Sequence, residues 1–175
     1  MRISGAVLSL PYDGIDTDQI IPARHLTVIE PGGLGRFLFT GNPELETRLS
    51  AAPHASILVA GADFGCGSSR EHAAWALCER GFQAVIAPSF ARIFLENAYN
   101  NGIVPVALAP EAVRECGLCV SLEIDVTEEV VHTDRGTRHA FALDPLRKTF
   151  LSNGGYLKYL DGKIPLIRAW AAARS

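Results

Sequence analysis

The sequence predicts an α/β fold with a parallel core and antiparallel additions. From residue 55 to residue 116, apolar runs of strand length alternate with helical patterns, which is the order of right-handed βαβ units. From residue 119 to residue 143, strand patterns instead follow one another through short turns. The chain has 175 residues, 48% hydrophobic and 20% charged, so we expect residues 1–175 to form a single domain.

The first half of the chain predicts two strands and a helix that ends at a glycine. Residues 3–9 have the pattern of a strand, and a polar loop with three aspartates follows. Residues 55–61, ASILVAG, form a continuous apolar run that is typical of a strand buried on both faces. Residues 70–80 place apolar side chains on one face of a helix, and we expect Gly81 to end it.

The second half alternates in the same way before its pattern changes. The expected parallel elements are a strand at 83–88, a helix at 89–101 capped by Ser89 and ended by Gly102, a strand at 103–108, and a helix from Pro110 to Cys116. Three strands are then expected at 119–126, 129–133 and 138–143, with a hairpin turn around 133–136. A last helix is expected to begin near Asp144 and Pro145 and to end at 153–155.

Composition and charge argue against several classes of protein. A net charge of −3 gives no basic footprint for nucleic acid or for an anionic membrane. No apolar run approaches the roughly 18 residues that span a bilayer, and the first residues have the pattern of a strand, not of a signal peptide. Four cysteines in a chain of this length do not indicate a disulfide framework. We therefore expect a cytoplasmic protein.

The stretch GADFGCGSSREH, residues 61–72, suits a binding site better than a core. It joins a strand to a helix at the carboxyl end of the strand, where open α/β sheets bind ligands. Glycines permit close approach of the backbone, helix N–H groups favour anions, and Arg70 offers a planar fork for a carboxylate or phosphate. The alternative is a plain turn capped by Ser68 or Ser69, which would need neither the glycines nor the arginine.

Other glycine-rich motifs do not match this stretch. The third glycine of a dinucleotide fingerprint is missing, no lysine follows as in a phosphate-binding loop, and neither serine lies in Gly-x-Ser-x-Gly. We therefore expect a small anion to be held beside two hydroxyl groups.

Four blocks of the chain together resemble one family. They are IDTDQIIPARHL (15–26), DFGCGSSREHA (63–73), APSFARIFLENAYNNGIVPV (87–106) and DPLRKTFLSNGG (144–155). Their sequence and order are similar to the small subunits of 3-isopropylmalate dehydratases, the swivel domains of the aconitase superfamily. The resemblance implies the swivelling β/β/α fold of aconitase-type domains and a hydro-lyase that is active only with a large subunit.

The resemblance also implies roles for single residues. The large subunit of such an enzyme holds a [4Fe–4S] cluster that binds the substrate, so no cofactor is expected on this chain. Ser68 would be the base that moves the substrate proton, and Ser69 and Arg70 would bind the substrate. Asp18, with Thr17 and Gly67, would lie behind the substrate and orient these groups.

A loop at Leu26, Thr27 and Val28 is implied to face the group that distinguishes one malate from another. Relatives that act on homocitrate-like acids carry an arginine where this chain has Thr27. An uncharged loop can cover an isopropyl group but cannot neutralise a buried carboxylate. The implied substrate is therefore the hydroxy-dicarboxylate 3-isopropylmalate, in leucine biosynthesis. Citraconate, methyl-substituted malates or a homoaconitate-type acid remain alternatives, the last because Arg24 could turn toward the loop.

Two patterns imitate metal sites. Asp13, Asp16 and Asp18 suggest a calcium loop, but the central glycine and the closing glutamate are absent. Cys116 and Cys119 have the spacing of a cluster motif, but without a matching partner pair they are more typical of packing residues. No metal is therefore expected on this chain.

Two other classes of function remain open from sequence. One is a non-catalytic relative that senses an anion or binds RNA, although the acidic charge balance argues against RNA. The other is a self-sufficient enzyme, for which no cofactor motif is visible.

Overall fold

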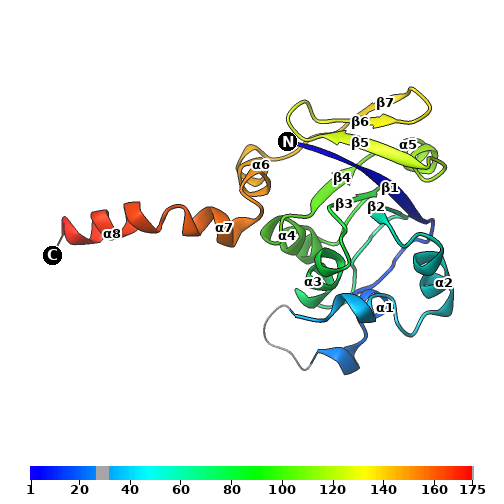
Figure 1. Cartoon of the computed structure of the whole chain (residues 1–175), viewed down its shortest axis with the longest axis horizontal. Helices are drawn as coiled ribbons and strands as arrows, with labels where there is room; N and C mark the ends of the chain where they lie inside the picture. Colours follow the sequence, from blue (N-terminus) through cyan, green and yellow to red (C-terminus); the bar gives the residue numbers. More distant parts are fainter. Residues whose placement is uncertain (27–31, 175) are drawn as a thin grey trace.

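The computed structural model describes residues 1–26 and 32–174, and a seven-stranded mixed sheet organises them. The strand order is β4-β3-β2-β1-β5-β6-β7 (Figure 1). The parallel half consists of β1 (Arg2–Leu10), β2 (Ala55–Ala60), β3 (Ala84–Ala87) and β4 (Val104–Ala107). The antiparallel half consists of β5 (Ser121–Asp125), β6 (Val130–Thr133) and β7 (Arg138–Ala140). The two halves meet where β1 pairs with β5, so the predicted parallel core with antiparallel additions is confirmed.

Side chains buried on both faces explain why the parallel strands are almost purely apolar. In β2, Leu58 packs into one core, whereas its neighbours Ile57 and Val59 point into a second core on the other face. The first core is covered by α1 (Thr17–Ile20), α2 (Pro43–Ala51), α3 (His72–Glu79) and α4 (Arg92–Asn100), with short 3₁₀ turns at Ala23–His25 and Gly35–Phe37. The second core is covered by α5 (Pro110–Cys116) and by the antiparallel half.

The sheet curls around α5. Val113 of α5 packs in the same core as Val59 of β2. On another side of α5, the Glu115 carboxylate accepts a hydrogen bond from the Thr137 hydroxyl at 2.5 Å and lies 3.1 Å from Nε2 of His139 in β7. One helix can contact both β2 and the distant strand β7 only because the sheet bends over it.

Glycines end two helices, as predicted. Gly81 follows α3 with a φ of 98°, and Gly102 follows α4 with a φ of 78°. In each case the next N–H group bonds back into the helix, from Phe82 to the Leu77 carbonyl and from Ile103 to the Ala98 carbonyl.

The predicted start of α4 is wrong. The helix begins at Arg92, and its N-cap, Ala91, makes no side-chain cap. The Ser89 hydroxyl instead accepts the N–H of Asp63 at 2.9 Å. Ser89 therefore supports the segment that follows β2, not the helix that follows it in the chain.

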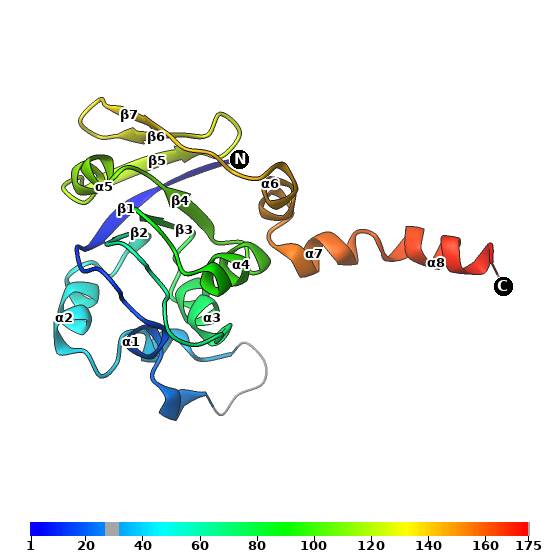
Figure 2. The ribbon, with the colours of Figure 1, turned by 180° about the vertical axis from the view of Figure 1, so that it is seen from behind.

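The end of the chain also differs from the prediction. The expected helix is present as α6 (Pro145–Ser152), with Asp144 accepting the N–H groups of its first turn. It is not the last helix, because α7 (Tyr156–Asp161) and α8 (Ile164–Ala172) follow it. Figure 2 shows α8 extending away from the rest of the chain. Among the described helices, none is both long enough and apolar enough to cross a membrane.

Candidate active site

The turn at residues 61–71, called the site turn, connects the carboxyl end of β2 with the start of α3. It runs alongside the segment that follows β1. The N–H of Gly65 donates to the Ile15 carbonyl at 2.8 Å, and the Thr17 N–H donates to the Cys66 carbonyl at 2.9 Å. Asp16 and Cys66, 50 positions apart in the sequence, form an isolated parallel bridge. The parallel pairing of β1 with β2 therefore resumes beyond the ends of the two strands.

Two glycines make this close approach possible. Gly65 has a φ of 79°, and a Cβ atom there would lie 2.3 Å from the ring of Phe94. Gly67 has a φ of 94° and packs against Thr17, whose hydroxyl would be 3.3 Å from an added Cβ atom. Both positions need the left-handed backbone that glycine adopts without strain.

Thr17 holds Ser68 in place. The Ser68 N–H donates to the Thr17 hydroxyl oxygen at 3.1 Å, and the hydroxyl oxygens of the two residues are 3.5 Å apart. The Thr17 side chain is buried, whereas Ser68 is exposed. The hydroxyl of Ser68 therefore lies at the surface on a backbone that is fixed from beneath, and Ser69 next to it is also exposed.

Arg70 forms an ion pair with Asp18, which belongs to α1. The Arg70 side chain is largely covered, with 24% exposed, whereas 57% of the Asp18 side chain is exposed. Asp16 fixes the start of α1, because its carboxylate accepts the Gln19 N–H at 2.7 Å and Gln19 bonds back to the Asp16 N–H. Asp16 is therefore a helix-capping residue. The carboxylate that restrains Arg70 is the exposed one of Asp18.

Two supporting contacts of the site turn were not predicted. Glu71 accepts a hydrogen bond from the Asn101 side chain at 2.9 Å, which ties the turn to the end of α4. The N–H of Ala62 donates to the Asp13 carboxylate at 2.7 Å. No local spacing indicates these pairs, because their partners are 30 and 49 residues apart.

The predicted substrate loop is described only at its first residue. Leu26 is half-buried and packs against the first core, whereas Thr27 and Val28 lie outside the described residues. Arg24 lies with its guanidinium 3.5 Å from the Thr40 carbonyl. It lines a hollow of about 290 Å³ that Asp18 also borders.

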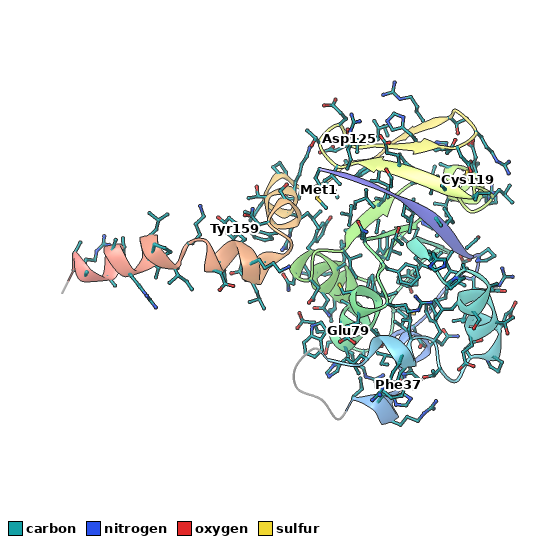
Figure 3. All side chains as sticks on the ribbon, viewed as in Figure 1. Met1, Phe37, Glu79, Cys119, Asp125 and Tyr159 are labelled. Carbon is teal, nitrogen blue, oxygen red and sulfur yellow. The ribbon has the colours of Figure 1, made fainter. Side chains whose placement is uncertain are left out.

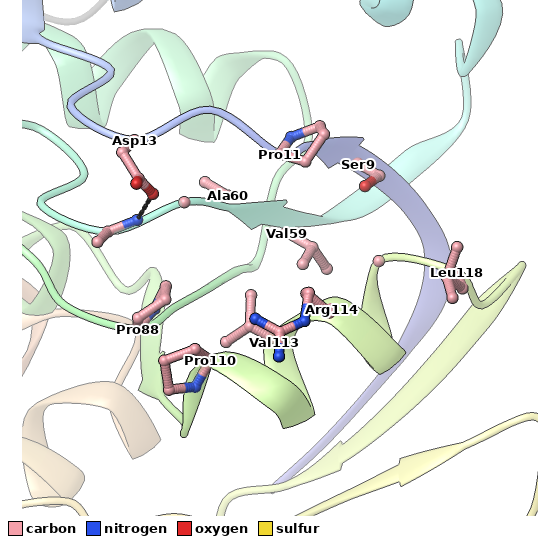
Figure 4. A pocket seen from close by; sticks show the side chains of 13 residues that line it. Ser9, Pro11, Asp13, Val59, Ala60, Pro88, Pro110, Val113, Arg114 and Leu118 are labelled. Carbon is pink, nitrogen blue, oxygen red and sulfur yellow. Dashed lines mark hydrogen bonds between the residues drawn. The ribbon is translucent and has the colours of Figure 1, made fainter.

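A larger cavity of about 540 Å³ lies elsewhere, beside α5 (Figure 4). Pro110, Val113 and Arg114 contribute from α5, and Val59 contributes from β2. Ser68 and Arg70 are not part of its lining. The serine and arginine of the motif therefore lie outside this cavity, Ser68 exposed and Arg70 partly covered.

All four cysteines carry thiols whose pKa is raised chiefly by burial, and Cys116 and Cys119 belong to the second core. Burial raises the pKa of the Cys116 thiol to about 12 and that of Cys119 to about 11. The pKa of Cys66 is also raised, first by burial, and its thiol donates to the Gly14 carbonyl at 3.4 Å. Within the described ranges, no group of three or more His, Cys, Asp or Glu side chains is arranged to hold a metal ion. These thiols do not form a cluster site there.

Comparison with known proteins gives a consistent result. The family model of the aconitase C-terminal domain matches residues 39–111. The 3-isopropylmalate dehydratase small subunit of Herpetosiphon aurantiacus is 41% identical over 96% of this chain and 90% of that protein. The protein of the same name from a Geobacillus strain is 44% identical over 86% of this chain and 83% of its own length. The crystal structure of a 3-isopropylmalate dehydratase from Methanocaldococcus jannaschii covers 98% of this chain, with 99% of its own length matched, 32% identity and a TM-score of 0.81.

The fold and the family match, which includes the site turn, define a domain of the aconitase C-terminal class. The expected swivel-domain fold is thus confirmed. Within that class, the chain belongs to the family of 3-isopropylmalate dehydratase small subunits. It is a hydro-lyase subunit.

Proposed function

We propose that this chain, as a single swivel domain, delivers the proton-transferring serine of 3-isopropylmalate dehydratase to a cluster-bearing large subunit. One observation carries the proposal. An exposed serine hydroxyl and an arginine lie on the same turn at the carboxyl end of β2, each fixed by a neighbour from α1. The reaction converts 2-isopropylmalate and 3-isopropylmalate into each other by dehydration and rehydration, as leucine biosynthesis in the cytoplasm requires.

Ser68 is the proposed base. A serine removes a proton from carbon only as an alkoxide-like group, which needs a dry site, hydrogen-bond donors and a nearby cation. Arg70, two residues along the turn, supplies the cation, and docking of the large subunit would exclude water. The buried Thr17 hydroxyl donates to the Ser68 hydroxyl oxygen at 3.5 Å and so holds the base in position from beneath.

Arg70 and Ser69 are the proposed substrate-binding groups. A substrate carboxylate would replace Asp18 as the partner of the Arg70 guanidinium, with the exposed Ser69 hydroxyl as a further donor. Asp18 would thus keep the arginine extended toward the site until the substrate arrives. Gly67 has the positive φ that lets the turn lie close against Thr17.

In this proposal, the large subunit supplies the Lewis acid and this chain supplies the base. When bound to the large subunit, the [4Fe–4S] cluster supplies a Lewis-acidic iron for the leaving hydroxyl group. Ser68 takes the proton from the adjacent carbon, and the electron pair of the broken C–H bond forms the double bond as the hydroxyl group leaves. Return of the proton and of the hydroxyl group, each to the carbon that the other left, gives the isomer.

Reconstitution with a cluster-bearing large subunit tests the proposal. Ser68→Ala should lower kcat by about 10²–10⁴-fold, because it removes the base while the turn keeps its backbone contacts. Ser152→Ala, which removes an exposed hydroxyl in α6, is the matched control and should retain full activity. Comparing kcat/KM for 3-isopropylmalate, citramalate and homocitrate in the same assay tests the substrate. A Ser68→Ala enzyme of normal activity would refute the assignment of the base, and a preference for homocitrate would refute the substrate.

A further inference from the structure

The α8 arm, defined as residues 162–174, has an unusual surface for a segment of folded structure. Every residue of the arm is exposed. Its large apolar side chains are Leu166 (64% exposed), Ile167 (54%), Trp170 (61%) and Ile164 (39%). Figure 3 shows its side chains standing around the helix, with no other described part of the chain beside them.

The arm leaves the body from a rigid base. The Phe150 ring of α6 packs against Tyr156 and Tyr159 of α7, with ring centroids 4.9 and 5.2 Å apart. Gly155 fits against the Asn100 carbonyl so closely that a Cβ atom would lie 2.3 Å from its oxygen. The helical path continues from α7 into α8, because the Lys163 N–H donates to the Leu160 carbonyl at 2.8 Å. Packed contacts therefore fix α7, and the arm continues from its end.

An isolated helix of this kind requires a partner. Helices shorter than about 12–15 residues are marginal in water, and α8 has nine residues. Six of the eleven large apolar side chains that are exposed within the described ranges belong to α7 and α8. Exposed apolar side chains gathered on one segment in this way mark an interaction site.

From these observations we infer that the α8 arm is the main apolar anchor of this chain on its large subunit, and this inference rests on the proposed function. The names of the relatives, all small subunits, imply a larger partner chain. The surface around Ser68, Ser69 and Arg70 is polar and must admit a substrate, so it cannot supply the apolar contact that a stable interface needs. Such an interface buries about 800 Å² on each partner, with aromatic residues at its centre.

The positive charge of the end of the chain favours a different chain, rather than a second copy of this arm, as the binding partner. Residues 156–175 carry four basic side chains and one acidic one, although the whole chain has a net charge of −3. Two such arms packed together would bring Lys163, Arg168 and Arg174 of both copies into one contact. The partner surface should therefore be an apolar groove bordered by acidic side chains.

The experiment compares two double variants of the full chain. Leu166→Glu with Trp170→Glu places charges on the arm, and Leu118→Glu with Val120→Glu places them on exposed apolar residues of the body. Calorimetric titration with the large subunit should show a Kd raised roughly 30-fold or more for the arm variant, because buried aromatic anchors dominate binding. The body variant should bind as the unmodified chain does. Circular dichroism and the thermal midpoint of each isolated variant should be unchanged.

The other outcomes of this experiment would contradict either the inference about the arm or the proposed function. An arm variant that binds the large subunit normally would overturn the inference while the proposed function stands. Light scattering that shows a dimer of the unmodified chain, lost in the arm variant, would assign the arm to a second copy and overturn it as well. Failure of the unmodified chain to bind the large subunit at all would refute the proposed function itself.

Discussion

Arg70 and Asp18 form an ion pair across 52 positions of the sequence, so the site is built from residues that are far apart in the chain. The arginine is mostly covered and its partner is mostly exposed, so the carboxylate can be displaced without unfolding anything. In the proposed role, an arginine restrained in this way would lose little rotamer freedom on binding a substrate carboxylate.

Arg70→Lys should raise KM by about tenfold to a hundredfold in the reconstituted enzyme, with a smaller change in kcat. The reason is that an ammonium group cannot reproduce the two parallel hydrogen bonds of a guanidinium, and bonds to charged groups contribute about 1.5–3 kcal/mol each. Steady-state kinetics measure the split between the two constants. Arg92→Lys, at the exposed start of α4, serves as the control. A kcat loss at unchanged KM would assign Arg70 to the transition state.

At the scale of elements, the site turn depends on the packing of α4. Gly65→Ala should destabilise the chain by roughly 2–5 kcal/mol, because the methyl group meets the Phe94 ring and the backbone is left-handed. Gly136→Ala separates the two causes, since its φ is 86° but no atom lies within 4 Å of its Cβ position. Urea unfolding should show only about 1 kcal/mol for Gly136→Ala. Equal losses at the two positions would show that the ring contact is unimportant.

Most elements could be predicted from sequence because their signals are local. Apolar runs predict β2 and β3, and glycines after α3 and α4 predict where these helices end. The start of α4 could not be predicted in this way, because the Ser89 hydroxyl bonds to Asp63 across 26 positions. The helices after Gly155 were missed because two adjacent glycines also suit a terminal loop, and here they pack against α4.

The candidate site follows the same division between local and distant signals. The motif predicts Ser68, Ser69 and Arg70, since all three belong to one short stretch. The contact of Glu71 with Asn101 joins two elements that meet only after folding, so no spacing predicts it. The pairing of Arg70 with Asp18 is equally nonlocal, although the resemblance implied that they lie near one another.

The whole molecule is joined at the pairing of β1 with β5, and Asp125 stabilises that seam. N–H donors of Glu128 and Thr127 and the Arg2 guanidinium hold the pKa of the Asp125 carboxyl below its usual value. A pKa that is lower in the folded state adds stability above the unfolded-state pKa of about 3.9. That contribution is lost as the pH falls through the folded-state pKa.

Asp125→Asn should therefore lower the free energy of unfolding at pH 7, and its difference from the unmodified chain should shrink as the solution becomes more acidic than pH 4. Urea unfolding at a series of pH values measures this difference. Glu128→Gln, which keeps the backbone donor, is the matched control and should follow the unmodified chain. A difference that is the same at every pH would contradict the role of the ionised carboxylate.

The position of β1 in the middle of the sheet also has a consequence for synthesis on the ribosome. One edge of β1 pairs with β2. The other edge stays unpaired until β5, which begins at Ser121, has been synthesised. At about 5–20 residues per second, the nascent chain carries this open edge for roughly 6–25 seconds. Unpaired strand edges promote aggregation. Translation that stops before Ser121 therefore releases a chain whose oldest strand is still available to the wrong neighbour.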